Sequence, residues 1–166
     1  EKEFNWNDEG IEGIFKFLNR FYALNENLNK KNDLIIESKL NRLIKKVTQD
    51  INEFKFNNAI ISIMEFSDYI KNKNYNQDTL GKLVLLISPF GPHLAEEMYS
   101  KLGNKNFASL ASWPKVDEKK INEELEKQEE IISKTIEDIN NIKKLSKIDN
   151  PKTYIYAITK ELKLFG

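Results

Sequence analysis

Residues 79–103 read TLGKLVLLISPFGPHLAEEMYSKLG: an apolar run, a proline-containing break and a second helical pattern. The run at 80–87 is apolar on every side, which is typical of a helix that is buried on every side. Pro89, Gly91 and Pro92 cannot continue that helix, so the sequence predicts a fixed kink. Pro92 suits the first turn of the next helix, where the N–H that it lacks would have no partner. We therefore expect 80–87 at the centre of a helical bundle.

Other stretches show the 3.6-residue apolar period of amphipathic helices. Helices are expected at about 9–27, 34–53 and 55–73, and a long one follows at about 117–147. The expected buried faces of the first two are Ile11, Ile14, Phe15, Leu18, Phe21 and Tyr22, then Ile36, Leu40, Leu43, Ile44, Val47, Ile51 and Phe54. The stretch 152–158, KTYIYAI, has the aromatic and β-branched residues of a short strand. The predicted fold is all-α, with a long C-terminal helix and a short terminal β-strand.

Length and composition limit the possible classes of protein. A chain of 166 residues predicts one domain with a real core. Its 26 basic and 26 acidic residues cancel, so any nucleic-acid footprint must be local. The absence of cysteine excludes disulfides and is compatible with a reducing compartment, so a cytoplasmic location is expected. No apolar run approaches the roughly 18 residues of a membrane span. Because the chain starts at Glu1 without a methionine, we interpret it as part of a longer protein.

Catalytic patterns are missing from this sequence. His93 is the one histidine and is interpreted as structural, since a lone histidine makes neither a metal cluster nor a paired nucleophile. The 6 glycines are scattered and form no phosphate loop. Glu96 and Glu97 are neighbours on a helix and point about 100° apart, which is poor geometry for a paired acid and base. We predict no catalytic residue and no metal ligand.

The most concentrated positive charge falls on the second expected helix. No acid lies between Ser38 and Gln49. A row of cations along a helix suits the phosphate backbone, which is bound by charge and not by sequence. For a single helix, a solvated face is the more usual explanation of such a row. The principal nucleic-acid-binding candidates are Lys39, Arg42, Lys45 and Lys46, and the secondary ones are Arg20, Lys16 and Lys55.

Three stretches resemble a known family. They are SPFGPHLAEEMYSKLG at 88–103 followed by Trp113-Pro114, GIEGIFKFLNRFY at 10–22, and INEFKFNNAIISIMEF at 51–66. In this order they resemble the helical anticodon-binding domain of class I aminoacyl-tRNA synthetases, and most of all that of the leucyl-tRNA synthetases. An isoleucyl, valyl or methionyl enzyme is the nearest alternative. A helical protein-interaction module, docking through 117–147, is an alternative from a different class.

The resemblance implies a domain organisation. An anticodon-binding-type helical bundle is expected at 1–114, a long helix packed on it at 115–150, and the start of a truncated C-terminal segment at 151–166. The family's nucleotide-binding signatures, HIGH-like and KMSKS-like, do not occur in this sequence. Catalysis is therefore expected from a core outside this chain.

The resemblance also implies a role in protein biosynthesis. The domain would dock tRNA(Leu) while the catalytic core of the same polypeptide performs ATP-dependent leucylation. ATP with Mg would serve that parent ligase, and no cofactor is expected in this chain. A monomer is expected, with no membrane partner. Leucine enzymes generally do not read anticodon bases, so contacts to RNA shape and phosphates should dominate.

Overall fold

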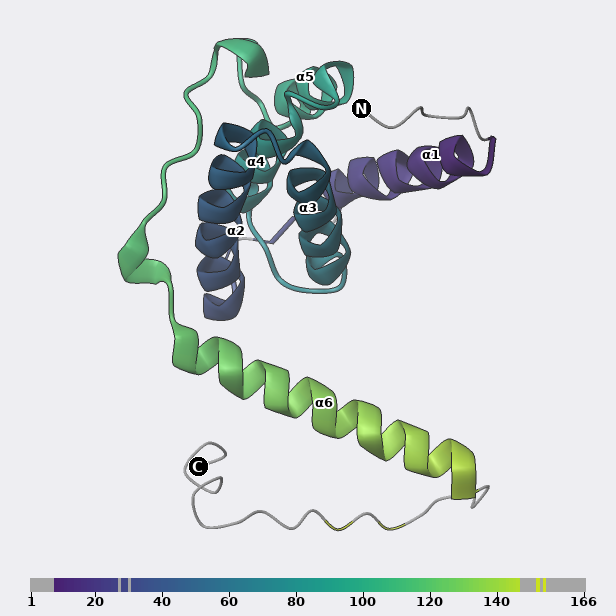
Figure 1. The fold of residues 1–166 in the computed structure, drawn as a ribbon. Helices are drawn as coiled ribbons and strands as arrows, with labels where there is room; N and C mark the ends of the chain where they lie inside the picture. The colour runs from purple at the N-terminus through teal and green to yellow at the C-terminus, as the bar shows by residue number, and fades with distance from the viewer. Residues whose placement is uncertain (1–7, 27, 30, 147–151, 153, 155–166) are drawn as a thin grey trace. The chain divides into compact units, whose positions relative to one another are not determined.

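The computed structural model describes residues 8–26, 28–29, 31–146, 152 and 154 (Figure 1). Residues 1–121 form one compact unit and 122–166 a second. The described part contains α1 (Asp8–Tyr22), η1 (Ala23–Glu26), α2 (Leu34–Asn52), α3 (Phe56–Ile70), α4 (Gln77–Ile87), α5 (Pro92–Lys101), η2 (Ala108–Leu110), η3 (Glu118–Lys120) and α6 (Glu123–Ser146). The all-α prediction is confirmed. The expected strand at 152–158 falls almost wholly outside the described residues.

Helix α4 lies at the centre of the first unit, as the apolar run predicts. Its buried side chains are Leu80, Leu83, Val84, Leu86 and Ile87. The helix begins where the Asn76 side chain accepts a hydrogen bond from the Thr79 backbone N–H at 3.0 Å. It ends at Ile87, and α5 starts directly at Pro92, so the predicted kink is confirmed.

Helices α2 and α3 form the most extensive pair and lie side by side (Figure 1). The α2 stripe is buried as expected from Ile36 to Val47. The prediction fails at Phe54, whose side chain is 80% exposed. The helix ends at Asn52, and Phe54 adopts a left-handed φ of 59° in the turn before α3. The reversal of the chain therefore carries Phe54 away from the α2 stripe.

The predicted buried face of α1 is wrong in its first half. Ile11, Ile14 and Phe15 are exposed, and the buried residues are Phe17 and Phe21. Helix α1 contacts α3 and α5, and its buried residues all lie in its second half. An apolar period shows which residues share a face, but it does not show how much of that face a neighbour covers.

Tyr75 connects two segments that look like polar loops in the sequence. It is fully buried, and its hydroxyl donates a hydrogen bond to the Leu24 carbonyl oxygen at 2.8 Å. Its own carbonyl oxygen accepts from the Asn29 N–H at 2.8 Å, and Leu28 forms a parallel bridge with it. Burial raises the pKa of Tyr75 to about 12. The segment after α3 is thus tied to the segment before α2.

The segment after α5 is fixed to the helices by polar contacts. The Glu96 carboxylate accepts from the backbone N–H groups of Ala108 and Ser109 at 2.7 and 3.0 Å. These bonds, the one from Ser109 first, lower the pKa of Glu96. The Trp113 indole N–H donates to the Thr48 hydroxyl of α2 at 2.9 Å. The segment after α5 is therefore anchored to α5 and α2 within the first unit.

Helix α6 belongs to the second unit. It has acidic residues in its first turn and Lys143 and Lys144 in its last, in agreement with the helix dipole. Its packing on the bundle stays a prediction, as do the domain boundaries at 114 and 150. Within the described ranges, no helix combines the length and hydropathy needed to cross a bilayer.

Candidate nucleic-acid interface

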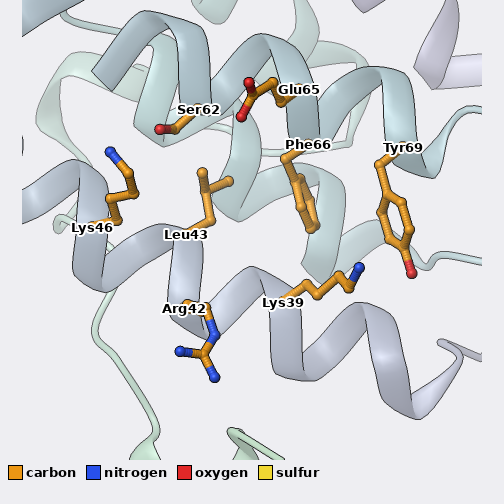
Figure 2. Close-up of a pocket in the computed structure, with 8 residues that line it drawn as sticks. All are labelled: Lys39, Arg42, Leu43, Lys46, Ser62, Glu65, Phe66 and Tyr69. Carbon is orange, nitrogen blue, oxygen red and sulfur yellow. The ribbon is translucent and has the colours of Figure 1, made fainter. Parts of the chain in front are cut away.

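A groove of about 290 Å³ runs between α2 and α3 (Figure 2). Both walls follow from helix periodicity, because residues at i, i+3, i+4 and i+7 share one face. Its lining residues are Lys39, Arg42, Leu43 and Lys46 from α2, and Ser62, Glu65, Phe66 and Tyr69 from α3.

The α2 wall carries three of the predicted cations. In Figure 2, Lys39 and Lys46 reach toward α3, while the Arg42 guanidinium points away from it. The Lys39 ammonium lies 4.3 Å from the centre of the Tyr69 ring, and Lys46 pairs with Asp50 at 2.7 Å. Three cations at i, i+3 and i+7 thus line one groove, and the only carboxylate among its lining residues is Glu65.

The fourth principal candidate lies elsewhere. Lys45 points to η3, where its ammonium contacts the Glu118 carboxylate at 2.9 Å. Glu118 is distant in sequence, so the acid-free stretch around Lys45 gives no sign of this partner. The row of four cations that the sequence suggests is therefore three groove residues and one residue paired outside the groove.

The secondary candidates do not join the groove lining. Arg20 pairs with Asp68 at 3.2 Å, which ties α1 to α3. Lys16 pairs with Glu12 at 2.6 Å on α1, and Lys55 pairs with Glu53 at 2.6 Å before α3. All three pairs are substantially exposed, so each contributes little to stability and can exchange with another anion.

The charge pattern of the sequence gives no sign of the aromatic floor of the groove. Phe66 is buried and Tyr69 is half-buried, with ring centroids 6.2 Å apart and planes inclined by 36°. Lys73 also places its ammonium 4.3 Å from the centre of the Tyr69 ring. The available sequence signal was the i, i+3, i+4, i+7 spacing of Ser62, Glu65, Phe66 and Tyr69 opposite the lysines. That signal has meaning only once α2 and α3 are known to be neighbours.

No metal centre competes with this groove as the candidate site in the described part of the chain. No three histidine, aspartate or glutamate side chains gather there in a way that could hold an ion. His93 is exposed in the first turn of α5. The arrangement can bind an anionic partner by charge and an aromatic partner by stacking.

The described helices form a bundle with a cationic groove on the α2–α3 pair, and comparison with known proteins gives its family. The family model described as the anticodon-binding domain of tRNA ligase matches residues 33–158. The chain belongs to this family. The bundle that was expected from the resemblance is therefore confirmed as an anticodon-binding domain.

Curated relatives of this chain include leucine–tRNA ligases. Leucine–tRNA ligase of Fervidobacterium nodosum is 36% identical over 148 residues, which cover 75% of this chain and 18% of the relative. The Thermotoga maritima enzyme is 37% identical, with coverage of 72% and 18%. The Pyrococcus abyssi enzyme is 33% identical, with coverage of 95% and 19%. The chain thus matches the anticodon-binding domain of leucine–tRNA ligases and spans about a fifth of their length.

A solved structure agrees with this assignment. The ternary complex of Agrobacterium radiobacter K84 agnB2 LeuRS with tRNA and LeuAMS contains a chain that superimposes with a TM-score of 0.63 at 27% identity. The match covers 72% of this chain and 18% of that one. The predicted resemblance to the leucyl branch is confirmed.

Proposed function

We propose that this domain docks tRNA(Leu) for a leucine–tRNA ligase, and that the α2–α3 groove contacts the phosphate backbone. The observation that carries the proposal is that Lys39, Arg42 and Lys46 all line one groove. A neighbour in fold is a LeuRS that was solved with tRNA. ATP-dependent leucylation, with Mg, would take place in parts of the ligase outside this chain.

Charge is the physical basis of the proposed contact. Phosphate groups attract Lys and Arg regardless of base sequence, and binding releases counterions from the RNA. The Lys46 side chain is half-exposed although its partner Asp50 is buried, so its ammonium can also contact a phosphate at the groove surface. Arg42 offers a planar guanidinium that can hold one phosphate with two hydrogen bonds. The groove would therefore position the tRNA without identifying a base.

Reversing the three groove cations together (K39E, R42E and K46E) should weaken binding of a leucine tRNA transcript by about a hundredfold near 0.1 M salt. Loss of up to three phosphate contacts should also reduce the slope of log affinity against log salt by about 2–3. Binding is measured by fluorescence anisotropy across a salt series, with an unrelated tRNA in parallel.

The matched control reverses Lys82, Lys105 and Lys115, which lie outside the groove and change the net charge equally. Only a small loss of affinity is expected from it. Equal weakening by both triple variants would show that binding depends on total charge and not on the groove. Unchanged affinity and salt slope in the groove variant would refute the proposal.

We also propose that an exposed apolar surface of the first unit docks the remainder of the ligase polypeptide. Phe54, Phe56 and Phe90 form an aromatic row with ring centroids 5.9 and 6.3 Å apart. An apolar hollow of about 190 Å³ is lined by Phe90 and by Ile14 of α1, and Phe15, the next residue along α1, is 65% exposed. Patches of this kind mark interaction sites in soluble proteins. The candidate partner is the remainder of a leucine–tRNA ligase, because this chain spans about a fifth of the length of such relatives.

The replacement of Phe15 and Phe54 with serine tests this surface. Both side chains are largely exposed, so the free energy of unfolding of this chain alone should stay within about 1 kcal/mol of the parent value. In the whole ligase, the same changes should lower the melting temperature of this domain and reduce leucylation. The control replaces Leu34 and Leu110 with serine. These two leucines are exposed to a similar degree as Phe15 and Phe54, and they lie outside the apolar surface. Marked destabilisation of this chain alone would contradict the proposal, because it would show that Phe15 and Phe54 stabilise the domain itself.

A further inference from the structure

The α2–α3 groove has a feature that a simple phosphate cradle does not require. The Tyr69 ring lies among its lining residues, half-exposed and next to the buried Phe66. The ammonium groups of Lys39 and Lys73 each lie 4.3 Å from the centre of this ring. An accessible aromatic ring among cations is the combination by which proteins bind unpaired nucleotides, through base stacking and charge.

The two walls of the groove differ in charge. The α2 wall supplies Lys39, Arg42 and Lys46, whereas the α3 wall supplies Glu65 and Tyr69. Glu65 and Tyr69 are four residues apart and therefore neighbours on the helix surface. The Glu65 carboxylate repels a phosphate, and the α2 cations attract one. A nucleotide entering the groove is thereby oriented, with its phosphates toward α2 and its base toward Tyr69.

We infer that the groove holds a single unpaired nucleotide of the bound tRNA, with its base stacked on the Tyr69 ring and its flanking phosphates on Arg42 and Lys46. The inference rests on the proposed tRNA-docking function and specifies the part of the RNA that the site takes. The volume of the groove, about 290 Å³, is of the order of one nucleotide. Because every base has a π-face, this stacking does not select a base identity.

The base replaces a lysine on the ring. An exposed cation–π contact is weaker than base–aromatic stacking, so the exchange favours the base. The displaced lysine still contacts the RNA, because its flexible side chain can turn to a phosphate of the same nucleotide. Lys39 and Lys73 both contact the ring in the RNA-free domain, and the one that the base displaces becomes a phosphate ligand in the complex.

Substitutions at Tyr69 separate stacking from charge. Tyr69→Leu keeps an apolar side chain and removes the aromatic face, whereas Tyr69→Phe keeps the face and removes the hydroxyl. We expect Tyr69→Leu to weaken binding of the leucine tRNA transcript by about tenfold. The salt slope should stay as in the parent, because no phosphate contact is lost. Tyr69→Phe should bind within about twofold of the parent.

A second measurement needs no substitution. A short oligouridylate that contains 5-iodouridine is bound to the unaltered domain and irradiated, and the cross-linked peptide is identified by mass spectrometry. The cross-link is expected on Tyr69. A cross-link that maps elsewhere, or a Tyr69→Leu variant that is folded and binds tRNA like the parent, would overturn the inference.

The two proposals fail in different ways. If reversal of the groove cations weakens binding and lowers the salt slope while Tyr69→Leu has no effect, the groove binds phosphate and the stacking inference is wrong. If neither change affects binding, tRNA does not use this groove at all. If both variants bind tRNA more weakly and only the charge reversal alters the salt slope, both the docking proposal and the stacking inference are supported.

Discussion

Tyr75→Ala is expected to destabilise the domain by about 3–5 kcal/mol, the cost of removing a large buried aromatic side chain. The ring is fully buried, and its hydroxyl holds the Leu24 carbonyl oxygen at the end of the α1–η1 segment. Its loss leaves a cavity and releases the junction between the segment before α2 and the segment after α3. Urea denaturation followed by circular dichroism measures the change.

Tyr75→Phe is the matched control, because it keeps the ring and removes only the hydroxyl. It should cost about 1–3 kcal/mol, since the buried Leu24 carbonyl oxygen loses its donor. A cost for Tyr75→Ala no larger than that for Tyr75→Phe would show that the ring is not part of the core.

The raised pKa of Tyr75 adds a pH dependence. An unfolded tyrosine ionises near pH 10, whereas the folded domain keeps Tyr75 neutral until about pH 12. The contribution of the neutral Tyr75 to the free energy of unfolding is therefore fully present below pH 10, and it declines as the pH rises toward 12. In Tyr75→Phe this component of the alkaline decline should be absent. Thermal unfolding of the two proteins at pH 8 and near pH 11 makes the comparison.

Leu83→Ala is expected to cost about 2–5 kcal/mol, because Leu83 is fully buried in the central helix α4. Packed helices surround α4 and limit how far the cavity can collapse. Cooperative denaturation of the chain in urea should shift to a lower midpoint, and the groove should stay intact where the variant remains folded.

Leu85→Ala makes the same change two residues further along α4. Leu85 is only partly buried, so about 1 kcal/mol is expected from it. If the two alanine variants lose equal stability, the centre of the bundle is not where the structure places it.

The groove could be predicted only in part from the sequence. Its cations were found because a helix with Lys39, Arg42 and Lys46 on one face and no nearby acid is visible as a pattern. Its aromatic floor was not found, because Tyr69 lies in a different helix, and the sequence does not state which face of α3 meets α2. The exclusion of Lys45 was equally hidden, since Glu118 lies far along the chain.

Local physical chemistry let the sequence alone determine the order of the α-helices, the buried apolar run at 80–87 and the kink before Pro92. The long helix, expected from about 117, begins at Glu123. A proline lacks an N–H wherever it stands, and a run that is apolar on every side needs burial in any arrangement. The tertiary structure alone decided that Ile14, Phe15 and Phe54 are exposed, that Tyr75 is core and that Tyr69 meets Lys39. Those outcomes depend on which surfaces the neighbouring helices cover, and such coverage is a property of contacts between segments that are distant in sequence.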